Sequence, residues 1–77
     1  GKGNALLRIA DELGIDRRRT IAIGDSFGDI SMFDVTGMSI AFNPKDMELT
    51  GARADHVVFS DNISEILDII FEVKDGI

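Results

Sequence analysis

The stretch TIAIGDSFGD, residues 20–29, decides the fold of this 77-residue chain. Its first four residues are mostly β-branched and apolar and are followed by Gly24, a pattern typical of a strand buried in a parallel sheet. Asp25 therefore falls at the carboxyl end of that strand, the end that faces the ligand crevice in open α/β sheets. Asp29 follows at the start of a helical pattern that we predict to run from Ser26 to Val35. The stretch thus predicts two carboxylates at one helix mouth.

This pair of carboxylates suits a divalent cation. Neighbouring carboxylates repel each other, and a bound cation offsets far more of this repulsion than a helix dipole does. We expect Mg²⁺, because it takes hard oxygen ligands and is usually held by one or two carboxylates plus a substrate phosphate. The alternative is structural, since an Asp between a strand and a helix is often only a cap. The short motif alone leaves both interpretations open.

The rest of the chain alternates between helical and strand patterns. Apolar residues at Leu6, Ile9, Ala10 and Leu13 predict an amphipathic helix over 4–13 that stops at Gly14. We further predict strands over 38–42 and 56–59, and a short helix from Asn43 and Pro44 to about Thr50. A last helix should begin with a capping box of Asn62 and Glu65. Its core stripe is predicted to consist of Ile63, Ile66, Leu67, Ile70 and Val73. This order predicts one α/β domain over 1–77, a three-stranded parallel sheet flanked by helices.

The motifs, taken in order, resemble the haloacid dehalogenase superfamily, and within it most closely the phosphoserine phosphatase-like branch. Residues 1–3 before an amphipathic helix resemble the third motif of that family, and residues 24–33 resemble the fourth. Residues 40–45 and 54–58 resemble the two strands beyond. The resemblance covers nearly the whole chain and implies a Rossmann-like core, of which residues 1–77 would be the carboxyl-terminal half.

The resemblance implies a role for three residues. Asp25 would be a magnesium ligand, and Asp29 would support the water shell of the metal and orient the lysine. Lys2 would neutralise charge on the phosphate of a small phosphorylated metabolite and on the attacking carboxylate. The implied activity is magnesium-dependent hydrolysis of phosphate monoesters through an aspartyl-phosphate, and a cation with a lysine is what such a reaction needs.

Two departures from the family pattern limit what the resemblance implies. The nucleophile belongs to an Asp-x-Asp motif on a strand that precedes Lys2, and no two Asp residues of this chain are two positions apart. We therefore expect the chain to supply the lysine and the acidic motif but not the nucleophile. Gly28 stands where an Asn is common in the family, which weakens any claim to phosphoserine as the substrate.

The absence of the nucleophile strand also predicts an interaction. In the family's sheet that strand pairs beside the strand of residues 20–23, which should therefore present an open edge here. An unpaired apolar edge invites another strand, so we expect one of three outcomes: a missing amino-terminal segment pairs with it, a second copy pairs with it in a homodimer, or the chain stays soluble with a loosened first strand. Two alternatives stay open: a noncatalytic truncated module that uses this edge, and the phosphorylation domain of a cation-pumping ATPase, which differs at two positions of the fourth motif.

Composition bears on partners and location. The formal net charge of −6 disfavours nucleic acid and anionic membranes as partners, because both attract basic surfaces. The chain has no Cys, no apolar run as long as a membrane span and no visible signal peptide, so we expect a cytoplasmic setting. Among the remaining charges we expect Lys45 to be a solvated helix end rather than a side chain that leans toward the crevice.

Overall fold

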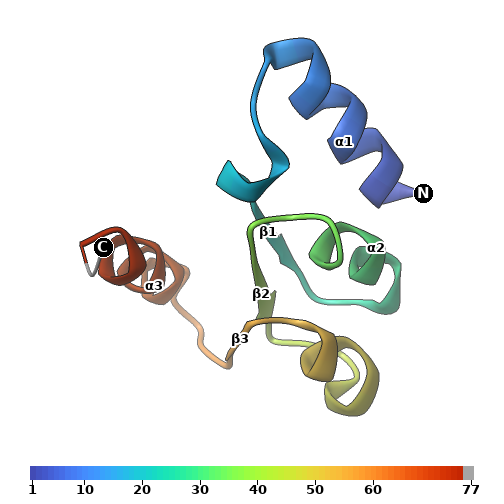
Figure 1. Ribbon diagram of the computed structural model, residues 1–77. Coiled ribbons are helices and arrows are strands. Elements are labelled where there is room, and N and C mark those ends of the chain that lie inside the picture. The colour runs from blue at the N-terminus through green and yellow to red at the C-terminus, as the bar shows by residue number, and fades with distance from the viewer. Residues whose placement is uncertain (76–77) are drawn as a thin grey trace.

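The computed structural model describes residues 1–75, and side chains up to residue 72. Strands β1 (Ile21–Gly24), β2 (Met38–Phe42) and β3 (His56–Val58) form a parallel sheet in the order β1-β2-β3. Helix α3 (Ser64–Asp75) lies on one side of the sheet, while α2 (Ile30–Phe33) and α1 (Lys2–Leu13) lie on the other (Figure 1). The predicted three-stranded α/β architecture is confirmed. Within residues 1–75, no helix is both long enough and apolar enough to cross a membrane.

The central strand β2 is buried on both faces, because successive side chains point to opposite sides of the sheet and both sides are covered. On the α2 side, Ala22 and Ala41 pack with Phe33. On the α3 side, Ile40 and Val58 pack with Ile66. These two small clusters hold the sheet between its helices and keep the carboxyl ends of β1 and β2 side by side.

Helix α1 begins two residues earlier than predicted and ends as expected at Gly14, which takes the left-handed conformation with φ 69°. Two residues of its apolar face, Ile9 and Leu13, are 57% and 67% exposed. The helix packs mainly on α2, where it buries Ala10. Helical periodicity shows which face is apolar, but it does not show whether another segment covers that face.

The segment after β2 corrects a second prediction. Asn43 does not start a helix: it has a φ of 48°, and its side-chain amide donates to Ser60 O and accepts from Ser60 N–H. The helical turn η3 (Met47–Gly51) is capped instead by Asp46, whose carboxylate accepts the N–H groups of the next turn. Asn tolerates the left-handed conformation as well as it caps helices, so its sequence position was ambiguous.

The other helix starts also differ from the prediction. The expected helix from Ser26 to Val35 is divided into a 3₁₀ turn, η2 (Phe27–Asp29), and the short α2. At the start of α3, the side-chain oxygen of Asn62 accepts the Ser64 N–H. In a capping box the Asn62 N–H would donate to the side chain of Glu65, but here it donates to Ser60 Oγ. Of the predicted stripe on α3, Ile66 is buried and Ile70 packs beside it, Ile63 and Leu67 are exposed, and the side chain of Val73 lies outside the described residues.

Strand β1 forms one edge of the sheet, as predicted. It pairs with β2 on one side, and within residues 1–75 no strand pairs with its other side. Ile21 and Ile23 are both exposed. A groove beside this region is lined by apolar residues of α1, among them Leu6, Ile9 and Leu13. Exposed apolar residues of β1 and α1 therefore lie near the free edge of β1, while others lie on η3, after β3 and along α3.

Candidate functional site

The three predicted site residues line one pocket at the carboxyl ends of β1 and β2. The pocket is formed by Lys2, Ile23, Gly24, Asp25, Asp29, Phe42 and Asn43. Parallel strands place their carboxyl ends at the same edge of a sheet, and the chain turns there into η2 and into the loop after β2. The structure thus brings the amino terminus of α1 to the loop that follows β1, although the two are more than twenty residues apart in the sequence.

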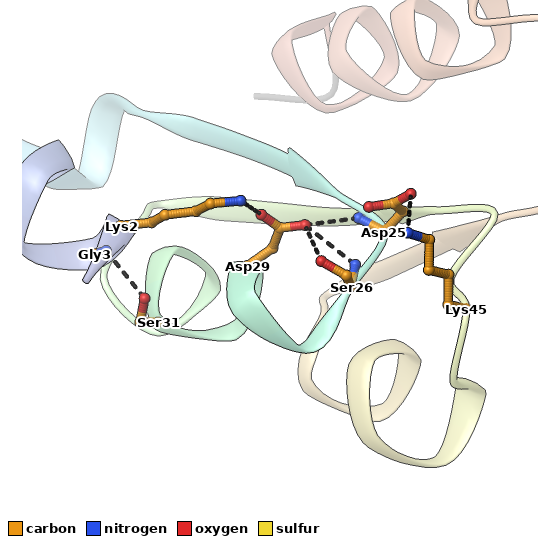
Figure 2. Close-up of polar contacts among 7 residues, drawn as sticks. All are labelled: Lys2, Gly3, Asp25, Ser26, Asp29, Ser31 and Lys45. Atoms are coloured by element: carbon orange, nitrogen blue, oxygen red, sulfur yellow. Dashed lines mark hydrogen bonds and ion pairs between the residues drawn. The ribbon is translucent and has the colours of Figure 1, made fainter.

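Asp29 organises the loop after β1. Its side chain is 7% exposed, and its Oδ2 accepts the backbone N–H groups of Asp25 at 3.0 Å and Ser26 at 3.1 Å (Figure 2). The bond from Ser26 is the one that an N3 carboxylate makes in a capping box. A Cβ at position 24 would lie 2.5 Å from the Asp29 carboxylate. Gly24 is therefore required here because the carboxylate passes so close to the backbone.

Lys2 completes this arrangement from the first turn of α1. Its Nζ donates to Asp29 Oδ1 at 2.7 Å (Figure 2). The backbone beside it is fixed on α2, because the Gly3 N–H donates to Ser31 Oγ at 3.0 Å and a Cβ on Gly3 would collide with the Ser31 backbone. Close packing of α1 on α2 therefore positions the ammonium group at the pocket.

The charges of Lys2 and Asp29 support each other. Burial of Asp29 disfavours its ionised form, but the hydrogen bonds from Lys2 and from the Asp25 and Ser26 N–H groups outweigh this and lower its pKa. The hydrogen bond to Asp29, together with the charge of that carboxylate, raises the pKa of Lys2. At neutral pH the pocket therefore holds an ionised carboxylate and a protonated amine.

Asp25 has a different environment. Its side chain is 52% exposed, and its backbone carbonyl accepts the Lys45 N–H at 2.9 Å. The Lys45 Nζ lies 4.0 Å from Asp25 Oδ2. The expectation that Lys45 is solvated is confirmed, since its side chain is 74% exposed, but it is not a helix end. It lies in the loop before η3, and its side chain extends toward Asp25 (Figure 2).

The donor set fits Mg²⁺ through Asp25. Both oxygens of Asp29 already accept hydrogen bonds, so Asp29 fits the orientation of Lys2 better than direct coordination. Asp25 presents its carboxylate to the pocket, and its one charged contact among the described residues is Lys45 Nζ at 4.0 Å. Residues 1–75 contain no cluster of three or more His, Cys, Asp or Glu side chains that could hold a metal ion. One carboxylate with waters and a substrate phosphate is an ordinary Mg²⁺ environment.

Two features of the site were missed in the sequence. The Lys45 contact had no local signal, because it joins loops after different strands. The bond between Asp29 and the Ser26 N–H did have one, since Ser-x-x-Asp has the spacing of a capping box. Reading that spacing would have placed Asp29 against the backbone of its own loop.

Comparison with known proteins defines the class of protein. Residues 1–70 match the family model of haloacid dehalogenase-like hydrolases. A parallel sheet with an acidic loop after β1 and a lysine beside it is in accord with this match. The chain belongs to the haloacid dehalogenase-like hydrolase family, and the resemblance inferred from its motifs is confirmed.

Within that family the chain is similar to phosphoserine phosphatases. It is 36% identical over 73 residues to the phosphoserine phosphatase of Streptomyces coelicolor, an alignment that covers 94% of this chain and 18% of that protein. It is 40% identical over 70 residues to the phosphoglycolate phosphatase of Methanothrix thermoacetophila, covering 87% and 31%. A crystal structure of phosphoserine phosphatase in apo form matches with a TM-score of 0.80 and 39% identity, covering 87% of this chain and 32% of that one. The chain thus spans less than a third of each of these proteins.

Proposed function

We propose that this chain is the lysine-and-metal half of a magnesium-dependent phosphatase of the haloacid dehalogenase type. The observation that carries the proposal is the 2.7 Å bond between Lys2 and the buried Asp29, at a pocket that Asp25 also lines. The phosphatase names of the relatives support the same reaction class. In this proposal Lys2 and Asp29 are the catalytic residues, and Asp25 is the metal ligand, with Asp29 acting on the metal only through its water shell.

The residues of this chain would act mainly by positioning charge. Lys2 has three ammonium hydrogens, and the bond to Asp29 uses one of them, which leaves the others for oxygens of a phosphate group. Its side chain is 58% exposed, so a phosphate entering the pocket can reach it. When bound, Mg²⁺ would supply further neutralisation of the phosphate charge at Asp25. Phosphoryl transfer depends largely on such positioning and charge stabilisation.

The nucleophile would come from outside the 77 residues. We propose that residues 1–77 form the carboxyl-terminal half of a core domain and that an Asp-x-Asp segment supplies the carboxylate that forms the aspartyl-phosphate. The small share of each relative that the chain spans supports this division. The proposed substrate is a small phosphorylated metabolite, the class to which phosphoserine and phosphoglycolate belong. A cytoplasmic setting stays a prediction from composition.

A complementation assay tests the proposal. Hydrolysis of p-nitrophenyl phosphate with Mg²⁺ is measured for the chain alone, and then with an added amino-terminal segment of a relative that bears Asp-x-Asp. We expect activity only in the mixture. Substitution Lys2→Met in the chain, or of the first Asp in the segment, should abolish that activity. A folded mixture without hydrolysis would contradict the proposal.

A second candidate function rests on the free edge of β1. The exposed Ile21 and Ile23, together with the apolar groove of α1, favour a noncatalytic module that pairs with another strand. Light scattering and amide exchange of β1 test this function. A stable dimer with protected β1 amides, combined with an inactive mixture, would favour it over the phosphatase. A monomer with rapidly exchanging β1 amides would exclude self-pairing.

A further inference from the structure

Lys45 is a charged residue beside the pocket, next to Asp25, and the proposed reaction assigns it no role. The charged side chains follow one another in the order Lys2, Asp29, Asp25, Lys45 (Figure 2). The backbone of Lys45 is fixed beside Asp25, because its N–H donates to the Asp25 carbonyl at 2.9 Å. The base of the Lys45 side chain is therefore held at the site even though its tip is exposed.

The two lysine–carboxylate pairs differ in a way that matters for function. Lys2 donates at 2.7 Å to a carboxylate that is almost fully buried and that three N–H or ammonium groups hold in place. Lys45 stands 4.0 Å from Asp25 Oδ2, which is too long for a hydrogen bond, and both side chains of this pair are more than half exposed. The first pair is fixed, whereas the second can separate with little loss of structure.

Asp25 is also the carboxylate on which a divalent cation would bind. Both oxygens of Asp29 are engaged, so the described pocket offers Asp25 as its accessible anionic oxygen donor. A cation bound to Asp25 would lie close to the Lys45 ammonium, and the two like charges would repel each other. The flexible four-carbon stem of Lys45 allows the ammonium to move out into water.

We propose that Lys45 is a displaceable counter-charge for Asp25: it neutralises this carboxylate in the metal-free site and gives way when a divalent cation binds. The inference rests on the proposed function, because it requires a metal at Asp25. Its consequence is that Lys45 lowers the affinity of the site for metal while it limits the repulsion between Asp25 and Asp29 in the metal-free protein. Lys45 is thus a positioning residue that acts through Asp25.

A titration with Mg²⁺ alone tests this inference on the 77-residue chain. The amides of Asp25 and Asp29 are followed by NMR at constant ionic strength for the wild type and for Lys45→Gln, Lys45→Arg and Arg19→Gln. Arg19 is the matched control, because it is exposed and lies just before β1, at the opposite end of the strand from Asp25. Amide spectra without metal show whether each variant is folded.

We expect Lys45→Gln to bind Mg²⁺ about fivefold more tightly, the effect of one unit charge about 4 Å away in water. Lys45→Arg should bind like the wild type because it keeps the charge, and Arg19→Gln should change the Kd by less than about twofold because of distance and screening. The advantage of Lys45→Gln should shrink at high salt, since the pair is exposed. A Lys45 with a merely structural role would not give this combination.

Several outcomes would overturn the inference. The first is that Lys45→Gln binds Mg²⁺ no more tightly than the wild type. The second is that Lys45→Arg or Arg19→Gln gains as much affinity as Lys45→Gln. The third is that no variant shows a metal-dependent shift at Asp25. The result is separable from the phosphatase assay. Tighter binding by Lys45→Gln with an inactive complemented mixture would refute the phosphatase proposal alone, whereas an active mixture with unchanged metal affinity in Lys45→Gln would refute only this inference.

Discussion

Replacement of Asp29 by Asn tests the hydrogen bonds that hold the pocket together. The carboxylate accepts Lys2 on one oxygen and the backbone N–H groups of Asp25 and Ser26 on the other. Asn has one side-chain oxygen, and its amide nitrogen only donates. If the oxygen stays on the backbone N–H groups, the amide nitrogen faces the ammonium of Lys2. The variant therefore loses the Lys2 bond and keeps the other two as neutral bonds.

The expected loss of stability follows from these three bonds. A hydrogen bond to a charged group contributes about 1.5–3 kcal/mol and a neutral one about 0.5–1.5 kcal/mol, so the two backbone bonds together lose about 2–3 kcal/mol. The loss of the Lys2 pair adds little, because its ammonium group is exposed to solvent. We expect Asp29→Asn to lower the free energy of unfolding by about 2–3 kcal/mol at pH 7. For a domain of this size that is a large part of the total stability.

Urea unfolding followed by circular dichroism measures this loss. Asp68→Asn is the matched control, because it removes an exposed carboxylate from α3 and should change the free energy of unfolding by less than about 0.5 kcal/mol. NMR titration of the Lys2 side chain gives an independent readout. Its raised pKa should return toward the ordinary value of 10.5 in Asp29→Asn and stay raised in Asp68→Asn.

Two results would refute this reasoning. If Asp29→Asn were as stable as the control, the buried carboxylate would not support the loop in the way its bonds indicate. If the pKa of Lys2 did not fall in Asp29→Asn, the 2.7 Å bond would not be the cause of its shift.

Three further predictions concern pH and backbone packing. Because the pKa of Asp29 is lowered in the folded protein, its stabilisation is complete above the ordinary value of 3.8 and is lost as the pH falls through the folded value below it. The raised pKa of Lys2 adds stability that is lost as the pH rises above 10.5. In pH-dependent urea unfolding the wild type should lose stability at both extremes, and both losses should be smaller in Asp29→Asn, where the lowered pKa of Asp16 still contributes at low pH. Gly3→Ala should lower the free energy of unfolding in urea by about 1–3 kcal/mol, because the added Cβ would strike the backbone of α2. The control is Gly28→Ala, which should change this free energy by less than about 1 kcal/mol because the added Cβ meets no atom within 4 Å. Asn43→Ala should cost about 1–3 kcal/mol in the same assay, and Asn43→Gly should be less harmful because it adopts the φ of 48° without strain; equal losses would mean that the backbone conformation contributes nothing.

Most of the fold could be predicted from the sequence, because buried parallel strands leave a local signal. The short apolar runs before Gly24 and before Asn43 marked β1 and β2 to within one residue. The signal failed after β2, where Asn43 was equally suited to a helix start and to a left-handed turn. Its conformation depends on Ser60, a residue 17 positions away that no local pattern identifies.

The site could be predicted in part for the same reason. Asp25 and Asp29 share one strand–loop–helix segment, so their spacing alone predicts that they lie close together. The contact of Lys45 with Asp25 depends on how the loops after β1 and β2 approach each other, and the sequence interpretation favoured a helix end that does not reach the crevice. The side chain is solvated, as expected, but it also lies beside Asp25.

The sequence by itself determined the strands, their order along the chain, and the acidic loop that follows the first of them. These features depend on side-chain period and on residues within a few positions of one another. The tertiary structure alone decided that Lys2 reaches Asp29 across 27 residues, that Lys45 stands beside Asp25, and that the apolar face of α1 stays exposed next to β1. Contacts between distant segments depend on how helices and strands pack in space, and a pattern read along the chain carries no measure of that distance.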